Sequence, residues 1–271
     1  MRILLALLLS VVAAKADWFG TGNLNTYFCG PNMTNSMNVL SNSITIAVWL
    51  RIRDTGTGLE QKNVFFSKGR LDFTASCNYL LRISGSKFEF DYTDQVGGLH
   101  TYQSSSTIIW TNRLRFVALT FTYGTAGSSM QMYLDGAPIS GSWTSGNGNS
   151  NSLPNQHEFS LSGPTAQVVG GGILMGEQGP VMAWRTNLSS TQIQMLYKTR
   201  VAGLPYVIYP QHCVLNIDWS NIRYGQDMES SQRIPSRVPW GQFVSNAIPR
   251  FGQSSSGNPL GSQLMSFWPN E

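Results

Sequence analysis

Apolar and polar side chains alternate with a period of two in several parts of the chain. The clearest run is Ile-Thr-Ile-Ala-Val-Trp-Leu-Arg-Ile at 44–52, where every second residue is a large aliphatic one. This alternation is typical of a β-strand with one buried face. Further runs rich in aliphatic and aromatic residues predict strands at 64–69, 79–84, 87–92, 115–122 and 129–134. The sequence therefore predicts an all-β domain.

Turn-forming residues separate these segments. Ser84-Gly85-Ser86 predicts a hairpin between two of the strands, and Asp135-Gly136 predicts a second one. Residues 140–155 are so rich in Gly, Asn and Ser that we expect a long exposed loop. A helical pattern occurs at 189–197, where Ser189 can cap the helix and Gln192 follows three residues later. We therefore expect one short helix.

Composition and charge exclude two classes of protein. With 41% hydrophobic and 11% aromatic residues, the 271-residue chain can bury a core and is not intrinsically disordered. Its 18 basic residues exceed the 14 acidic ones by only 4 and form no run that could neutralise a row of phosphates. We therefore expect no nucleic-acid partner.

The two ends of the chain differ in composition from the middle. The N-terminus is typical of an export signal cleaved after Ala16, because it contains Arg2, an apolar run at 3–12 and Ala14-Lys15-Ala16. The alternative is that this segment is retained as an apolar anchor. The run is shorter than the roughly 20 residues of a transmembrane helix, so we expect no membrane span and a secreted protein. Prolines concentrate after position 204. We therefore predict a signal at 1–16, a domain at 17–204 and a Pro-rich C-terminal extension of unknown role at 205–271.

The three cysteines, Cys29, Cys77 and Cys213, leave at least one thiol unpaired. We expect a Cys29–Cys77 disulfide, with three buried free thiols as the alternative.

Five segments occur in an order that resembles a known family. Residues 43–50 resemble its tryptophan-containing strand, 66–69 its Ser-Lys-Gly strand, 114–121 its strongest strand, 132–136 its Tyr-Leu-Asp-Gly turn and 179–197 its closing strand and helix. Together they resemble the laminin G-like, concanavalin A-like jelly-roll family in its divergent bacterial or phage form, over about 20–200. One departure is Leu114, where the family has a tryptophan; here Trp110 lies four residues earlier.

This resemblance implies a two-sheet antiparallel jelly-roll sandwich whose loops carry the function. The fold hosts lectins, adhesion domains, glycosidases and virion decorations, so it names no activity by itself. Calcium is common in the family, and Asp91, Asp94 and Asp135 offer oxygen atoms, but the sequence contains no visible set of six to eight ligands. We expect no cofactor.

A pair of carboxylates raises the question of catalysis. The stretch 89–94 resembles the catalytic strand of laminarinase-type glycosidases, and Glu89 and Asp91 share one face of a strand. Asp94 stands where that strand has a longer Glu. The alternative is a solvent-facing strand surface opposite a buried face of Phe88, Phe90 and Tyr92. His100, His157 and His212 look isolated, and no serine lies in a nucleophile elbow, so we expect no enzyme.

The strongest binding candidate is an aromatic residue among amides. Trp143 lies near Asn147 and Asn149, and Tyr102 with Gln103 can line the same edge. A sugar binds by stacking on an aromatic ring while amides pair with its hydroxyls. The alternative is that Trp143 folds back onto the sandwich or packs against a neighbouring subunit.

These observations lead to two main hypotheses. The first is an exported, non-catalytic module that binds a polysaccharide or surface glycan, as a lectin or adhesin does. The second is a structural virion or surface-assembly protein, with a homo-oligomer or an assembly as its partner. Glycoside hydrolysis by Glu89 and Asp91 is a distant third.

Overall fold

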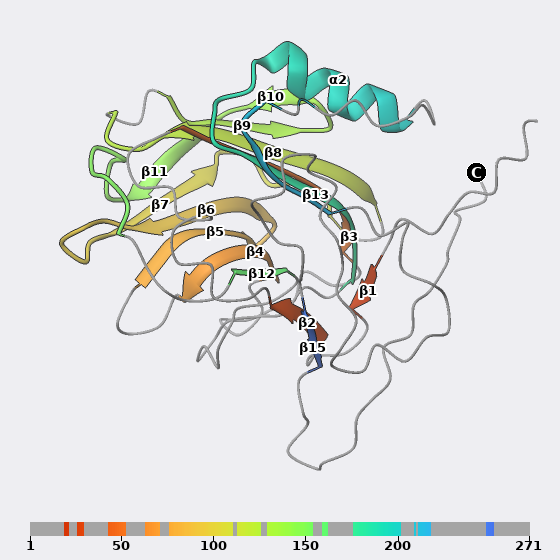
Figure 1. The fold of residues 1–271 in the computed structure, drawn as a ribbon. Coiled ribbons are helices and arrows are strands. Elements are labelled where there is room, and N and C mark those ends of the chain that lie inside the picture. The colour runs from red at the N-terminus through yellow and green to blue at the C-terminus, as the bar shows by residue number, and fades with distance from the viewer. Residues whose placement is uncertain are drawn as a thin grey trace, which may run out of the picture.

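A computed structural model describes residues 19–21, 26–29, 43–52, 63–70, 76–110, 113–125, 129–153, 159–161, 176–201, 209, 211–217 and 248–251. These residues form two antiparallel β-sheets that pack face to face and one helix, as Figure 1 shows. The predicted jelly-roll sandwich is therefore confirmed. The predicted signal at 1–16, the boundary at 204 and His157 lie outside the described residues and remain predictions.

One of the two sheets has seven strands. Its order is β1 (Phe19–Thr21), β13 (Gly176–Trp184), β3 (Ser43–Ile52), β8 (Leu114–Thr122), β9 (Gln131–Leu134) and β10 (Ala137–Ile139), and β14 (Cys213–Ile217) also pairs with β13. β3 pairs with β8 from Ser43 to Arg51, and Thr45 lies opposite Thr120. All pairs in this sheet are antiparallel.

The eight-stranded sheet faces it. Its order is β11 (Gly141–Ser145), β7 (Leu99–Ser104), β6 (Lys87–Thr93), β5 (Ser76–Ser84), β4 (Asn63–Arg70), β12 (Phe159–Leu161), β2 (Thr26–Cys29) and β15 (Ile248–Phe251). β5 and β6 form the predicted hairpin, with Gly85 and Ser86 at positive φ as a tight turn requires. β14 and β15 come from the predicted extension and add one strand to each sheet.

The main core lies between the sheets and follows the alternation in the sequence. Ile46 and Val48 on β3 face Phe90 and Tyr92 on β6, and all four are fully buried. The Phe90 ring meets Phe121 of β8 edge-on, with centroids 5.7 Å apart. The predicted buried face of β6 is therefore confirmed.

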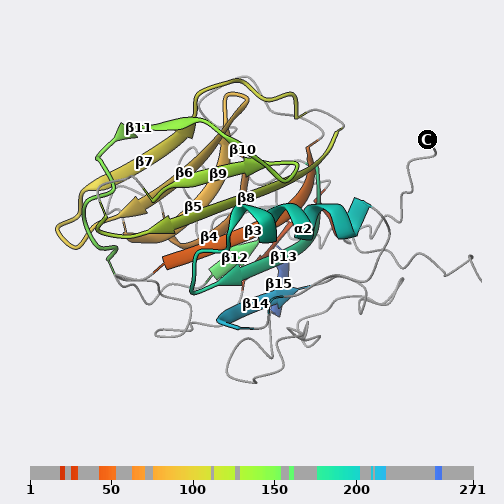
Figure 2. The ribbon, with the colours of Figure 1, turned by 90° about the horizontal axis from the view of Figure 1, so that it is seen from above.

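A second core lies on the outer side of the seven-stranded sheet. Helix α2 (Ser190–Val201) lies over that side of the sheet (Figure 2). Its Ile193 and Leu196 pack there against Trp49 and other aromatic residues of the sheet. The helix begins with the expected cap, since Ser189 Oγ accepts from the Gln192 backbone N–H at 3.3 Å and Gln192 Oε1 accepts from Ser189 N–H at 2.8 Å. In the part of the chain that the structure describes, no helix is long and apolar enough to span a bilayer.

The chain crosses from the edge of one sheet to the edge of the other between β10 and β11. β11 pairs with β7, with Trp143 opposite Tyr102. The prediction of an exposed loop over 140–155 is therefore wrong for residues 141–145, which form an edge strand. A single apolar side chain, Trp143, faces inward while its polar neighbours face outward, so the segment showed no clear alternation.

The predicted Cys29–Cys77 disulfide is also wrong, because Cys77 is a buried free thiol. β12 and β4 separate β2 from β5 in the sheet. Three strand spacings amount to about 14 Å, whereas bridged cysteines have Cα atoms less than about 7 Å apart.

We expect Cys77 to resist alkylation in the native protein. Burial raises the pKa of its thiol, the nearby Asp91 carboxylate raises that pKa further, and the Arg82 guanidinium partly opposes both. Since the thiolate is the reactive form, iodoacetamide at pH 8 should leave Cys77 unmodified until the protein is unfolded in urea. Peptide mass spectrometry measures this, and a Cys29–Cys77 cross-linked peptide would contradict the structure.

Candidate functional site

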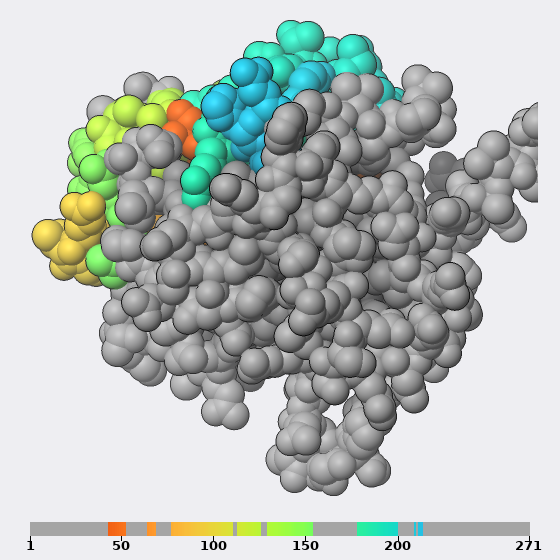
Figure 3. Space-filling model, viewed as in Figure 1, coloured from red at the N-terminus to blue at the C-terminus, as the bar shows by residue number. Residues whose placement is uncertain are grey.

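Two segments meet at one edge of the sandwich and form a surface that we call the rim, residues 94–98 and 142–152. Asp94 makes a β-bridge with Ser152, and the Leu153 backbone N–H donates to Thr93 O at 2.8 Å. The β6–β7 turn and the segment after β11 therefore lie side by side, at the left in Figures 1 and 3. Both reach the surface there, and Val96 is 91% exposed at the tip of the turn.

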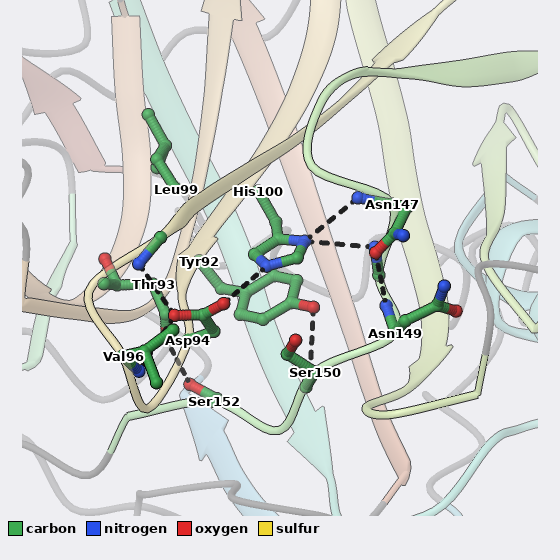
Figure 4. A network of polar contacts seen from close by, with 12 residues as sticks. Tyr92, Thr93, Asp94, Val96, Leu99, His100, Asn147, Asn149, Ser150 and Ser152 are labelled. Atoms are coloured by element: carbon green, nitrogen blue, oxygen red, sulfur yellow. Dashed lines mark hydrogen bonds and ion pairs between the residues drawn. The ribbon is translucent and has the colours of Figure 1, made fainter.

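His100 on β7 joins the two segments of the rim (Figure 4). Its Nε2 lies 3.1 Å from Asp94 Oδ2, and its Nδ1 accepts the backbone N–H groups of Asn147 and Gly148, both at 3.1 Å. A ring nitrogen that accepts hydrogen bonds carries no proton, so these contacts assign the proton to Nε2. The interpretation of His100 as isolated is therefore wrong.

The ring of His100 is fixed from its flat side by Tyr92. The two rings stack with centroids 4.5 Å apart and an angle of 13° between them. Burial raises the pKa of the Tyr92 hydroxyl, which therefore keeps its proton and donates it to Ser150 O at 2.9 Å. Tyr92 thus supports both the imidazole and the segment that follows β11.

Asp94 is held by its own turn. Its Oδ1 accepts the backbone N–H groups of Val96 at 3.0 Å and Gly98 at 2.7 Å. Burial by itself would raise the pKa of this carboxyl, but the hydrogen bonds from His100, Gly98 and Val96 together lower it below the ordinary value. Asp94 is therefore an anchored carboxylate at neutral pH.

The lowered pKa of Asp94 predicts a loss of stability in acid. A carboxyl whose folded pKa lies below its unfolded value of about 3.9 stabilises the fold above that value. This contribution disappears as the pH falls through the lower folded pKa. We expect the free energy of unfolding, from urea titrations between pH 2.5 and 6, to fall more steeply below about pH 4 in wild type than in Asp94→Asn. Equal slopes would contradict this prediction.

Asn147 and Asn149 lie exposed on the rim. The Asn149 backbone N–H donates to Asn147 Oδ1 at 3.1 Å. This hydrogen bond occupies the side-chain oxygen of Asn147. The side-chain amino group of Asn147 has no partner among the described residues and can donate to a ligand.

Trp143 packs back onto the sandwich, which is the alternative considered above. Its half-buried ring meets Tyr102 edge-on at 5.2 Å and His100 edge-on at 6.1 Å. Gly148 lies directly on this ring: its φ is +71°, and a Cβ there would stand 2.4 Å from Trp143 Cζ2. The indole Nε1 is buried without a hydrogen-bond partner in the described part of the chain.

Gln103 lies apart from the other predicted site residues. It occupies the face of β7 opposite Tyr102, and its Nε2 donates to Glu89 Oε2 at 2.9 Å. The structure therefore brings Trp143, Tyr102, Asn147 and Asn149 together around His100 but places Gln103 on the outer face of the sheet.

Glu89 and Asp91 share that outer face, as their spacing predicts. Arg82 on the neighbouring strand pairs with both, through Nη2 to Glu89 Oε1 and through Nε to Asp91 Oδ2 at 3.0 Å. Thr101 Oγ1 also donates to Asp91, at 2.6 Å. Glu89 is only 4% exposed and Asp91 is fully buried, so the alternative of a solvent-facing strand surface is wrong. The arginine between them makes their burial possible.

The candidate metal ligands do not converge. Asp91 belongs to the Arg82 cluster and Asp94 to the rim, while Asp135 accepts from Phe116 N–H at 3.0 Å and pairs with Arg115. Among the residues that the structure describes, no three His, Cys, Asp or Glu side chains lie close enough to hold a metal ion.

Comparisons with known proteins bear on the fold. No curated protein matches the sequence. A solved candidate carbohydrate-binding protein from Bacteroides ovatus ATCC 8483 is 16% identical with a TM-score of 0.52, over 78% of this chain and 54% of that one. This chain thus spans about half the length of that protein. A SAP-like pentraxin from Limulus polyphemus is 13% identical with a TM-score of 0.38, over 64% of this chain and 82% of the pentraxin. The match to the Bacteroides protein, at 16% identity and a TM-score of 0.52, shows the fold alone.

The family comparison covers most of the chain. A laminin G-type model, described as the concanavalin A-like lectin/glucanases superfamily, matches residues 21–194. This range includes β6, β7 and β11, which carry the rim, and the start of helix α2. The chain belongs to the concanavalin A-like lectin/glucanases superfamily.

Proposed function

We propose that the protein is an exported, non-catalytic module that binds an uncharged polysaccharide or surface glycan at the rim. The observation that carries this proposal is the chemistry of the rim surface. Its exposed side chains beside Trp143 are amides and hydroxyls: Ser142, Thr144, Ser145, Asn147 and Asn149. Such groups pair with sugar hydroxyls, and the part of the Trp143 ring that remains exposed offers apolar contact to a sugar ring.

The absence of charge favours a neutral glycan. Neither 95–110 nor 136–153 contains an Asp, Glu, Lys or Arg. Asp94, at the border of the rim, is buried and held by hydrogen bonds. Sulfated or sialylated glycans are usually bound through basic side chains, which these stretches lack.

A non-catalytic role is supported by the contacts that occupy the buried carboxyl groups and the imidazole. Glu89 and Asp91 are both paired with Arg82, whereas glycoside cleavage needs one carboxyl free to donate a proton. The Nδ1 lone pair of His100 is occupied by two loop amides, so this nitrogen is unavailable as a general base.

A surface-assembly role is the second candidate, favoured by exposed apolar side chains. Ile109 is 63% exposed and Leu114 is 40% exposed. Arg115, the neighbour of Leu114, connects the two segments, because its side chain donates two hydrogen bonds to Ile109 O. Exposed apolar residues of this kind occur at protein–protein contacts.

Light scattering of wild type and of Ile109→Ser tests the surface-assembly role. For this role we expect wild type to form a homo-oligomer that dissociates in the variant.

A binding experiment tests the glycan proposal. The probes are dextran, laminarin and galactomannan as uncharged polysaccharides, and heparin and chondroitin sulfate as charged ones. We expect wild type to bind at least one uncharged probe, with an affinity that changes little between 50 and 500 mM salt. Asn149→Ala should weaken binding roughly tenfold, or about 1.4 kcal/mol.

Two further variants sharpen the result. Gln194→Ala on helix α2 is a matched control on another exposed amide and should bind like wild type. Trp143→Ala should abolish binding, although its contacts with Tyr102 and His100 mean that its stability must be measured alongside. Binding only to the sulfated probes, or release of reducing sugar from any of them, would contradict the proposal.

A further inference from the structure

We propose that His100 is the positioning residue of the rim: in its Nε2–H tautomer, fixed by Asp94, it holds residues 146–149, the amide loop, in the conformation that contacts the glycan. This inference rests on the proposed function. His100 itself is 5% exposed and does not contact the ligand.

The amide loop is shaped to surround a single acceptor atom. Gly146 and Gly148 have φ values of +60° and +71°. Left-handed residues in such a loop turn successive backbone N–H groups toward one point, an arrangement that usually holds an anion. Here the N–H groups of Asn147 and Gly148 converge on His100 Nδ1 instead. A Cβ at position 146 would stand 2.3 Å from that nitrogen, which shows how closely the loop surrounds it.

A chain of contacts fixes which nitrogen is the acceptor. Asp94 accepts from His100 Nε2 through Oδ2, while its Oδ1 accepts from Val96 and Gly98. The carboxylate is thus oriented by its own turn and can accept only, so it requires the imidazole proton on Nε2. The stacked Tyr92 ring prevents the imidazole from rotating out of this plane.

The loop conformation decides what the ligand meets. With its backbone held by His100, the loop places Asn149 N–H against Asn147 Oδ1, which leaves the Asn147 amino group outward as a donor (Figure 4). A loop that lost its acceptor would sample several conformations, and the ligand would have to order it on binding. The position of His100 therefore contributes to affinity without any contact with the sugar.

The test is Asp94→Asn, which changes the tautomer with the fewest changes in shape. The Asn oxygen can still accept from Val96 and Gly98, and its amino group then faces His100 Nε2. Nε2 must now accept a hydrogen bond, so the imidazole proton moves to Nδ1. There it points at the backbone N–H groups of Asn147 and Gly148, which lose their acceptor. The same change of tautomer occurs in a protease triad whose aspartate is replaced by asparagine. We expect the ¹⁵N spectrum of the imidazole to report protonated Nδ1. We also expect faster amide exchange at Asn147 and Gly148, and at least tenfold weaker binding of the uncharged polysaccharide that binds wild type best among dextran, laminarin and galactomannan.

A second variant, at His100 itself, provides an independent test of the same inference. His100→Phe keeps the stacking on Tyr92 but offers no acceptor, so it should give the same loss of amide protection and of affinity, and it replaces Asp94→Asn if that variant does not fold. Unchanged affinity in a folded variant with the altered tautomer would overturn the inference and leave the proposed function intact. Tighter binding would also overturn it, because the loop would then be a cover over Trp143. If wild type binds none of the three polysaccharides, the proposed function fails and the inference fails with it.

Discussion

Arg82→Met is expected to lower the free energy of unfolding by about 3–5 kcal/mol. Arg82 is only 6% exposed and compensates two carboxylates, Glu89 and Asp91, which are buried on the same face of the sheet. Methionine is also a long unbranched side chain, but it carries no charge, so the two neighbouring carboxylates lose the cation that pairs with both. Urea unfolding of wild type and variant at pH 7 measures the difference.

Two controls separate the charge effect from packing. Arg115→Met removes a less buried ion pair, in which the side chain of Arg115 is 17% exposed and that of Asp135 is 25% exposed. It should lower the free energy of unfolding by about 1 kcal/mol or less. Adding Glu89→Gln and Asp91→Asn to Arg82→Met removes the uncompensated charges and should restore much of the loss. A loss below about 1 kcal/mol in Arg82→Met alone would show that the carboxylates are hydrated.

Trp49→Ala is expected to lower the free energy of unfolding by a similar amount, about 3–5 kcal/mol. The indole stacks on Tyr197 of helix α2, with centroids 5.6 Å apart and an angle of 18° between the rings, and packs on Phe116 at 5.1 Å. It is 2% exposed, so its removal leaves a cavity between the sheet and the helix. Thermal unfolding followed by far-ultraviolet circular dichroism measures the change.

The matched control for Trp49 lies on the other side of the same helix. Met195 is 43% exposed, and Met195→Ala should change stability by no more than about 0.5 kcal/mol. If Trp49→Ala and Met195→Ala had equal effects, α2 would not be docked through the aromatic cluster.

Much of the fold could be predicted because its signals are local. The alternation at 44–52 and 115–122 reflects strands that bury one face against the opposite sheet, and the cap at Ser189 needs only Gln192 nearby. β11 could not be predicted in this way, since its pairing with β7 depends on residues far along the chain. The tryptophan missing at Leu114 also has a structural explanation: Trp110 is buried instead and donates to Ser86 O at 2.9 Å, while Leu114 is exposed.

The candidate site was predictable only in part. Trp143 and the neighbouring asparagines are recognisable by composition. The contacts of His100 are not, because its contact with Asp94 depends on the β6–β7 turn and its contact with Asn147 depends on how the chain folds back after β11. The Gly97-Gly98 turn is the signal that could have indicated it, because a tight turn brings residues on either side together. Tyr102 and Gln103 are adjacent in a strand, so the period of two already requires that they face opposite sides.

The pairing of β3 has a consequence for how the chain acquires its fold. Thr45 lies between Thr120 of β8 and Trp184 of β13, so this early strand obtains its second neighbour only from a segment made much later. β2 depends in the same way on β15. A topology dominated by such distant partners has a high contact order and folds slowly, with unpaired strand edges exposed in the meantime. Refolding yield should therefore decrease with protein concentration, because these edges can associate between chains before each one is complete.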